Sequence, residues 1–176
     1  MNYITTRNVI DAPSLHLICC DKEMLEALFE SDAALAALLG INIPATWTEH
    51  GEPAFKWTYA KLSVGNANIQ WWTYLPVLKS ENMLVGSCGF KGDPDNGMVE
   101  IGYEVAGTYR GKGLATEIAR TLIDFAFQHD EVKFVQAHTL AEKNESGSIL
   151  KKCGMQRTGE VDDPDDGKLW RWEITR

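Results

Sequence analysis

The sequence is poor in cysteine, and the cysteines present do not form a metal-binding pattern. Cys19, Cys20, Cys88 and Cys153 lack the paired spacing of a zinc site, and four thiols in 176 residues are too few for a disulfide scaffold. The four histidines are scattered along the chain without ligand spacing. We therefore expect no metal ion, and free thiols in a reducing compartment, the cytoplasm.

Basic residues are fewer than acidic ones. The chain has 17 Lys and Arg and 25 Asp and Glu, which gives a net charge of −8. A nucleic-acid binder needs a basic surface to neutralise phosphates, so we expect no nucleic-acid partner. An acidic balance is compatible with a cationic or amine substrate, although most acidic surfaces serve only solubility.

Long apolar runs are missing. The most apolar stretch, residues 33–43, is too short to span a bilayer, and residues 1–4 lack the basic and then apolar pattern of a secretion leader. We expect no membrane partner. At 44% hydrophobic and 24% charged residues, the composition is that of a globular protein, and the length suits a single domain over residues 1–176.

Apolar periodicity predicts an α+β domain. We expect a helical region between a cap at Asp21 and a stop at Gly40, divided near Ser31, and two helices besides the central one, at residues 54–62 and 142–153. Residues 1–14 have no strong pattern and are expected to be a lead-in. The predicted strands are residues 15–20, 69–77, 83–90, 98–105, 132–139, 155–161 and 169–175.

The chain is organised around residues 98–128. A strand with alternating apolar residues is followed by a glycine-rich turn, Arg110-Gly111-Lys112-Gly113, and then by a helix with apolar residues at helical spacing. The first turn of a helix has unpaired N–H groups and a partial positive charge, and glycines let an anion approach the backbone. The pattern predicts a pyrophosphate site.

Three kinds of phosphate site compete for this turn. A P-loop needs Gly-x-x-x-x-Gly-Lys-Ser/Thr, which is absent. A dinucleotide site needs a third small residue, where this chain has Thr116, and an acidic residue after the next strand, which is also missing. Arg110-Gly111-Lys112-Gly113-Leu114-Ala115 instead matches the Arg/Gln-x-x-Gly-x-Gly/Ala signature of the coenzyme A loop in GNAT acetyltransferases.

The surroundings strengthen this resemblance. The segments that flank the loop, and a second block, resemble the GNAT branch that contains ribosomal-protein N-terminal acetyltransferases; they are residues 99–103, 115–117, 137–146 and 150–155. The resemblance is firm over residues 83–160. It implies a GNAT-like single domain, with a mixed, mostly antiparallel central sheet of six to seven strands flanked by helices.

The resemblance also implies residues that bind acetyl-CoA. Backbone groups of Tyr103, Glu104 and Val105 would pair with the pantetheine arm, and Asn144 would contact the coenzyme while also capping its helix. The Arg110 and Lys112 side chains would be available to phosphates. The N–H groups expected to hold the pyrophosphate are those of Arg110, Gly111, Lys112, Gly113, Leu114 and Ala115.

The implied reaction is acetyl transfer from acetyl-CoA to a primary amine, which is either a protein N-terminus or a small-molecule amine. Glu100 is the expected catalytic base, usually through a water molecule, and Glu104 is the second choice. Many GNAT enzymes supply the acid from a tyrosine that is missing from residues 149–152. Ser146 is our catalytic substitute for it.

Two other function classes remain open. The missing tyrosine motivates a non-catalytic acyl-CoA-binding module, which would keep the loop and lose turnover. Nucleotide binding without acyl chemistry is weaker, because neither nucleotide fingerprint is complete. Exposed strands in such folds can pair, so a homodimer is an expected assembly. Trp47, Trp57, Trp71, Trp72 and Tyr74 are expected in the core or in an acceptor pocket, and Trp170 and Trp172 on one strand face.

Overall fold

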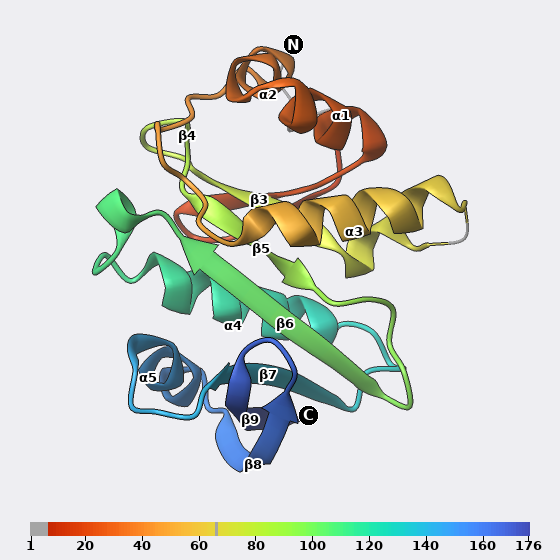
Figure 1. Ribbon diagram of the computed structural model, residues 1–176, viewed down its shortest axis with the longest axis vertical. Helices are drawn as coiled ribbons and strands as arrows, with labels where there is room; N and C mark the ends of the chain where they lie inside the picture. The colour runs from red at the N-terminus through yellow and green to blue at the C-terminus, as the bar shows by residue number, and fades with distance from the viewer. Residues whose placement is uncertain (1–6, 66) are drawn as a thin grey trace.

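A mixed sheet of nine strands runs through the computed structural model, which describes residues 7–65 and 67–176 (Figure 1). The strand order is β1-β2-β3-β5-β6-β7-β9-β8, with the short β4 paired to β3. Every neighbouring pair is antiparallel except β6 and β7, which are parallel. The predicted α+β class and the mostly antiparallel sheet are confirmed.

The elements follow the predicted order along the chain. The strands are β1 (Val9–Asp11), β2 (Leu15–Cys19), β3 (Thr73–Leu78), β4 (Met83–Leu84), β5 (Gly86–Phe90), β6 (Met98–Val105), β7 (Phe134–Leu140), β8 (Gln156–Asp163) and β9 (Gly167–Thr175). The helices are α1 (Lys22–Glu30), α2 (Asp32–Leu39), α3 (Gly51–Ser63), α4 (Leu114–Ala126) and α5 (Glu145–Lys152), with short 3₁₀ turns at Ile69–Trp71 and Gly107–Tyr109.

Side-chain caps explain the division of the first helical region. Asp21 accepts a hydrogen bond from the Met24 N–H at 2.9 Å and starts α1, and Ser31 accepts one from the Ala34 N–H at 3.0 Å and starts α2. Gly40 then ends α2 with a φ of 66°, in the left-handed region that glycine adopts easily. The predicted break near Ser31 and the predicted stop are confirmed.

Three details of the sheet differ from the sequence prediction. The sheet exceeds the expected six to seven strands because β1, which lies in the presumed lead-in, pairs with β2 over only three residues and is too short to show a period. The expected strand at residues 83–90 divides at Val85 into β4 and β5. Ile69–Trp71 forms a turn before β3, because the Asn68 side chain accepts a hydrogen bond from the Gln70 N–H at 3.4 Å.

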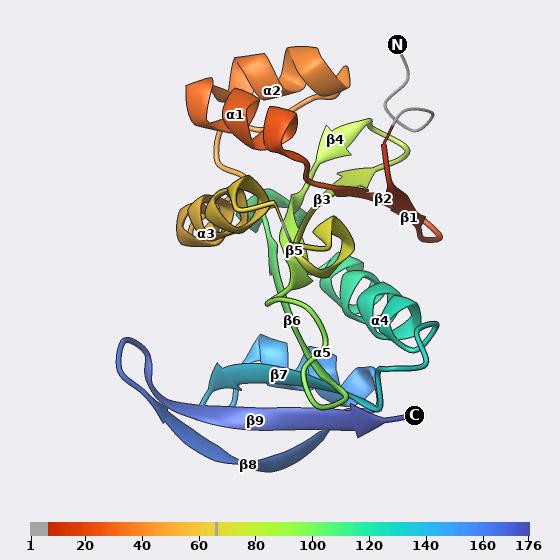
Figure 2. The same ribbon diagram turned by 90° about the vertical axis from the view of Figure 1, so that its right-hand side faces the viewer.

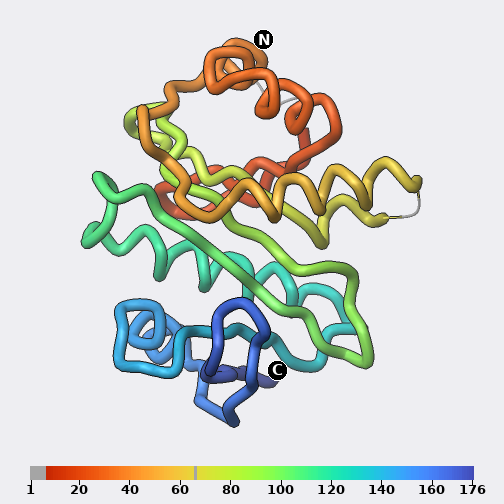
Figure 3. Tube along the Cα trace, viewed as in Figure 1, coloured from red at the N-terminus to blue at the C-terminus, as the bar shows by residue number. Residues whose placement is uncertain are grey.

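Helices cover both faces of the sheet. In Figure 2, α3 lies on one side of β5 and β6, and α4 lies on the other. Figure 3 shows the N-terminal helices gathered at one end of the molecule and the β8–β9 hairpin at the other. The side of α4 that faces the sheet is fully apolar and buried, with Leu114, Ile118, Ala119, Leu122, Ile123 and Ala126. This packing fixes the start of α4 against the end of β6.

Strands β6 and β7 stay paired for a short distance only. The pairs are Met98 with Phe134, Val99 with Val135, and Glu100 with Gln136. Beyond Glu100, residues 101–105 of β6 pair with β5 alone. The two strands therefore part, and the backbone of residues 101–105 has no strand partner on the β7 side.

Residues 1–4, for which we expect no leader, lie outside the described part of the chain. Across residues 7–65 and 67–176, none of the helices combines the length and the apolar character needed to cross a membrane.

Candidate functional site

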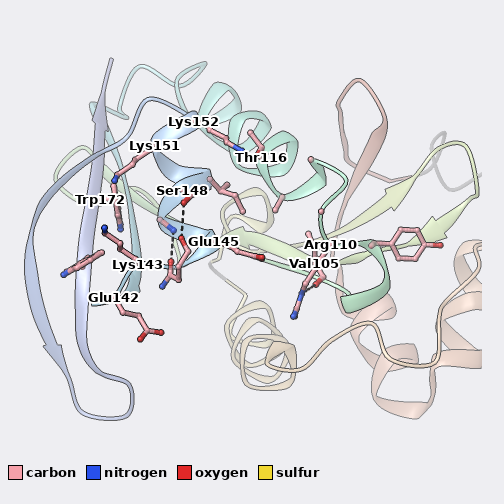
Figure 4. A pocket seen from close by; sticks show the side chains of 18 residues that line it. Val105, Arg110, Thr116, Glu142, Lys143, Glu145, Ser148, Lys151, Lys152 and Trp172 are labelled. Carbon is pink, nitrogen blue, oxygen red and sulfur yellow. Dashed lines mark hydrogen bonds between the residues drawn. The ribbon is translucent and has the colours of Figure 1, made fainter.

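A cavity of about 690 Å³ lies between the first turn of α4, helix α5 and strand β9 (Figure 4). It brings together residues that the sequence places far apart. Six of them are predicted coenzyme ligands: Val105, Arg110, Gly111, Gly113, Ala115 and Asn144. The remaining lining residues are Tyr109, Thr116, Glu142, Lys143, Glu145, Gly147, Ser148, Ile149, Lys151, Lys152, Trp170 and Trp172.

The glycine turn at the start of α4 is open to an anion. Gly111 and Gly113 have φ values of 76° and 81°, so both positions favour glycine. A Cβ atom added at either glycine would have no atom within 4 Å. Gly113 is the N-cap of α4 and offers no side-chain hydrogen bond to the helix, which leaves the first-turn N–H groups available to a ligand. The turn therefore fits a pyrophosphate.

Arg110 and Lys112, whose side chains are predicted to bind phosphate, contact other groups in this structure. The Arg110 Nε donates to the Val105 carbonyl at 3.0 Å, and its Nη2 lies 3.3 Å from a carboxylate oxygen of Glu49. The Lys112 ammonium lies 4.7 Å from the centre of the Tyr109 ring. Both side chains would have to leave these partners to reach a phosphate.

Sequence reasoning missed three lysines on the cavity wall, Lys143, Lys151 and Lys152. They gather positive charge at the cavity of a chain whose net charge is −8. Two of them are the basic residues in the last turn of α5, which was a usable signal. Such placement favours an anionic ligand.

Helix α5 begins at the cavity with Asn144 as its cap. The Asn144 Oδ1 accepts a hydrogen bond from the Gly147 N–H at 2.8 Å, so the predicted capping role is confirmed. Gly147 and Ser148 line the cavity, whereas Ser146 lies beside it and accepts a hydrogen bond through its carbonyl from the Tyr103 hydroxyl at 3.4 Å. Burial raises the pKa of Tyr103, so this phenol stays protonated as a donor.

Replacing Asn144 with alanine tests both of its roles. We expect a loss of about 0.5–2 kcal/mol in the free energy of unfolding, because the α5 cap is removed, together with weaker coenzyme A binding. Urea unfolding and calorimetry measure the two effects. Ser31→Ala is the matched control, since it removes the α2 cap far from the cavity. Equal coenzyme A affinity in the two variants would leave Asn144 as a cap alone.

Glu100 lies at the last paired position of β6, on the face opposite α4. Its carboxylate is paired with the Lys91 ammonium, lies 3.0 Å from the His138 Nδ1, and lies 3.5 Å from the Gln136 side-chain nitrogen. Burial alone would raise the pKa of Glu100, but the charge and hydrogen bond of Lys91, with those of His138, bring it below its ordinary value. The carboxylate is therefore ionised at neutral pH.

Glu104, on the same strand face, holds the loop that precedes α3. Its carboxylate accepts hydrogen bonds from the Thr48 hydroxyl at 3.0 Å, from the Glu49 N–H, and from the His50 N–H at 3.4 Å. These donors position the loop beside the strand. They also occupy the Glu104 carboxylate, which is the second candidate for the catalytic base.

The two C-terminal tryptophans lie together, as predicted, and both line the cavity. Their ring centres are 6.4 Å apart, and the Trp172 indole N–H donates to the Thr139 hydroxyl at 3.0 Å. Among the N-terminal aromatics, Trp57 is 48% exposed and packs edge-on against the Trp72 ring. The others are buried in the core, namely Trp47, Trp71, Trp72 and Tyr74.

The described residues contain no group of three or more His, Cys, Asp or Glu side chains able to hold a metal ion. All four cysteines are free thiols. Burial raises the pKa of Cys19 to about 12 and raises those of Cys20 and Cys88 as well, so these three are unreactive.

Comparison with known families decides what kind of domain carries this site. A family model described as "Acetyltransferase (GNAT) domain" matches residues 6–156. The chain belongs to the GNAT acetyltransferase family. The predicted recognition, made from the glycine turn and the blocks around it, is thereby confirmed.

Relatives of this GNAT chain are named as N-acetyltransferases. The uncharacterized N-acetyltransferase YjdG of Bacillus subtilis is 28% identical over 151 residues, which cover 83% of this chain and 88% of that protein. The uncharacterized N-acetyltransferase p20 of Bacillus licheniformis is 31% identical over 93 residues, so the match spans only 52% of each protein.

The GNAT fold is shared with a solved structure described as RimL, the ribosomal L7/L12 alpha-N-protein acetyltransferase, in complex with coenzyme A. The superposition has a TM-score of 0.68 at 16% identity and covers 96% of this chain and 98% of that one. At this identity the likeness shows the fold alone.

Proposed function

We propose that this GNAT domain transfers the acetyl group of acetyl-CoA to a primary amine. The observation that carries the proposal is the cavity that joins the open glycine turn at α4 to the end of β6, where β6 has left β7. Such a cavity can hold a pyrophosphate at one end and an extended acyl arm at the other. Family membership and the coenzyme A complex of RimL support the same ligand.

The coenzyme would be held mainly by backbone groups. The N–H groups of residues 110–115 would bind the pyrophosphate, and Asn144 would contact the coenzyme from the start of α5. Tyr103, Glu104 and Val105 would offer backbone groups to the pantetheine arm, because this part of β6 lacks a β7 partner. The Val105 carbonyl would first have to exchange its Arg110 donor.

The reaction is a direct attack of the neutral amine on the thioester carbonyl carbon. A C–N bond forms, the C–S bond breaks, and its electron pair leaves with the sulfur. The ammonium proton would leave toward Glu100, which is ionised and lies on the face of β6 opposite α4. Ser146 would donate a hydrogen bond to the developing thiolate, which takes up a proton from solvent and leaves as the free thiol of coenzyme A.

Two acceptor types fit this reaction, a protein N-terminal amine and a small-molecule amine. RimL is described as acting on a ribosomal protein and another structure of this fold as a spermidine N-acetyltransferase, so both acceptor types occur on the fold. We also propose a cytoplasmic location, because free thiols persist in reducing compartments. A homodimer stays a prediction.

A non-catalytic acyl-CoA-binding module is the second candidate. One observation favours it: residues 149–152 contain no tyrosine, and Ser146, the proposed substitute, lies beside the cavity rather than on its wall. This module would bind coenzyme A and release no thiol.

Thiol release from acetyl-CoA tests the proposed function. We expect turnover with at least one member of a panel of short peptides, a ribosomal-protein tail and small amines. Turnover with a peptide would identify a protein acceptor, and turnover with a small amine alone would identify a small-molecule acceptor. Coenzyme A binding without turnover across the panel would favour the module, and equal binding of ATP or NAD would contradict the coenzyme assignment.

A further inference from the structure

His138, which has no role in the coenzyme loop or in the proposed acid step, makes a directed contact with Glu100. Its Nδ1 lies 3.0 Å from the Glu100 Oε1. An ionised carboxylate can only accept hydrogen bonds, so the Nδ1 must carry the hydrogen. The neutral ring then has an unprotonated Nε2, which is the form that can accept a proton.

His138 lies on β7 just beyond the point where β6 and β7 part. Glu100 and Gln136 form the last paired position, and His138 lies two residues further along β7 on the same face of the sheet. The His138 side chain is 15% exposed. Its Nε2 has no hydrogen-bond partner among the residues that the structure describes. The imidazole is therefore oriented at one nitrogen and available at the other.

Glu100 is better suited to orient a base than to be one. The Lys91 ammonium shares the carboxylate oxygen that His138 contacts, and the pKa of Glu100 lies below its ordinary value. A proton placed on this carboxylate would weaken the pair with Lys91. Imidazoles as a class exchange protons near neutral pH, where general bases work best.

We propose that the His138 Nε2 accepts the proton that the acceptor amine loses, and that Glu100 is the positioning residue that fixes its tautomer and balances the imidazolium charge. The proton moves from the acceptor ammonium to Nε2, directly or through one water, and then passes to solvent. The inference rests on the proposed function and refines the part played by Glu100.

Charged groups from each neighbouring element surround this imidazole. Glu100 and Lys91 face it from β6 and the loop before it. Arg171 is its partner across β9, and Asp163, at the end of β8, is electrostatically coupled to it. Glu173, on the same face of β9, pairs with Arg171 at 3.4 Å. Anionic and cationic groups are therefore both present, so no single-sign field overrides the hydrogen bond to Glu100 in setting the ring tautomer.

The tautomer can be measured without any acceptor. In ¹⁵N NMR spectra of the full chain at neutral pH, we expect His138 to carry its hydrogen on Nδ1, with a bare Nε2. The signal is assigned by its loss in His138→Gln. In Glu100→Gln we expect the Nδ1 preference to disappear. A hydrogen on Nε2 in the wild-type chain would overturn the proposal.

Kinetics then test the proton transfer. In His138→Gln, whose amide can still donate to Glu100, we expect kcat/KM for the amine to fall by about 100-fold or more, because general-base catalysis contributes about 10²–10⁴-fold. We expect unchanged coenzyme A affinity and a pH profile of kcat/KM that differs from that of the wild-type chain. His129→Gln, at the opposite end of α4 from the glycine turn, is the matched control.

The outcomes separate this inference from the proposed function. His138→Gln activity within twofold of wild type, or an unchanged pH profile of kcat/KM, would overturn the role of His138 while acetyl transfer stands. A wild-type chain that binds coenzyme A and acetylates no amine would overturn both.

Discussion

Gly113→Val is expected to reduce coenzyme A affinity by about 100-fold or more. The side chain would occupy the open approach to the turn, where no atom now lies within 4 Å of a Cβ position. It would also strain the backbone, since the φ of 81° is unfavourable for a branched residue. Losing two hydrogen bonds to a charged group, at about 1.5–3 kcal/mol each, accounts for such a change. Isothermal titration calorimetry measures it.

Gly40→Val is the matched control for strain. Gly40 has a φ of 66° and the same open surroundings, but it ends α2 rather than starting α4. We expect each variant to lose about 1–3 kcal/mol of unfolding free energy and only Gly113→Val to lose coenzyme binding. Wild-type affinity in a folded Gly113→Val chain would rule out the pyrophosphate site.

Glu100→Gln is expected to lower kcat by about 10²–10⁴-fold, the range that proton-transfer catalysis contributes. The amide keeps the size of the side chain but removes the negative charge that pairs with Lys91 and His138. Coenzyme A affinity should stay at the wild-type value, because Glu100 does not line the cavity. Thiol release and calorimetry on one preparation separate the two effects.

Glu104→Gln distinguishes the two carboxylates. The loss of the Glu104 charge weakens the hydrogen bonds that hold residues 48–50. We therefore expect a higher KM for the acceptor with little change in kcat. The opposite pattern, with full activity in Glu100→Gln and a collapse of kcat in Glu104→Gln, would reassign the acceptor-side role to Glu104.

The same Glu100 carboxylate predicts a pH dependence of stability. A pKa that is lower in the folded chain than in the unfolded chain stabilises the fold above the unfolded value, about 4.3 for glutamate, and this contribution is lost as the pH falls through the folded value. We therefore expect wild type to exceed Glu100→Gln in unfolding free energy near pH 7 and the difference to shrink below about pH 4. A difference that grows with acid would contradict the pairing with Lys91.

Local signals made the central part of this fold predictable. The glycine turn, the amphipathic α4, the caps at Asp21 and Asn144 and the break near Ser31 are each encoded within a few residues, and the structure has them where the sequence places them. Gly111 and Gly113 could be assigned because positive φ and an open approach are properties of glycine itself.

The parts that were missed depend on contacts between distant segments. Trp170 and Trp172 become cavity walls only because β9 pairs with β7, and Lys151 only because α5 lies beside α4. His138 contacts Glu100 because β6 and β7 pair in parallel, and no local sequence pattern predicts this pairing. The positions of these residues at the site therefore depend on the order of the strands and on which side chains are brought into contact.

The short β6–β7 pairing also has a mechanical consequence. Three residue pairs, with the Gly97 carbonyl that accepts from the Lys133 and Phe134 N–H groups, form the main-chain hydrogen-bonded link between strands β1 to β6 and strands β7 to β9. We expect sub-global opening to cost less, and amide hydrogens to exchange earlier, at this short link than within either part of the sheet. A ligand that bridges both sides of this link stabilises the closed form according to its concentration and affinity. Binding of such a ligand in the cavity therefore shifts the opening equilibrium between the two parts of the sheet toward the closed form.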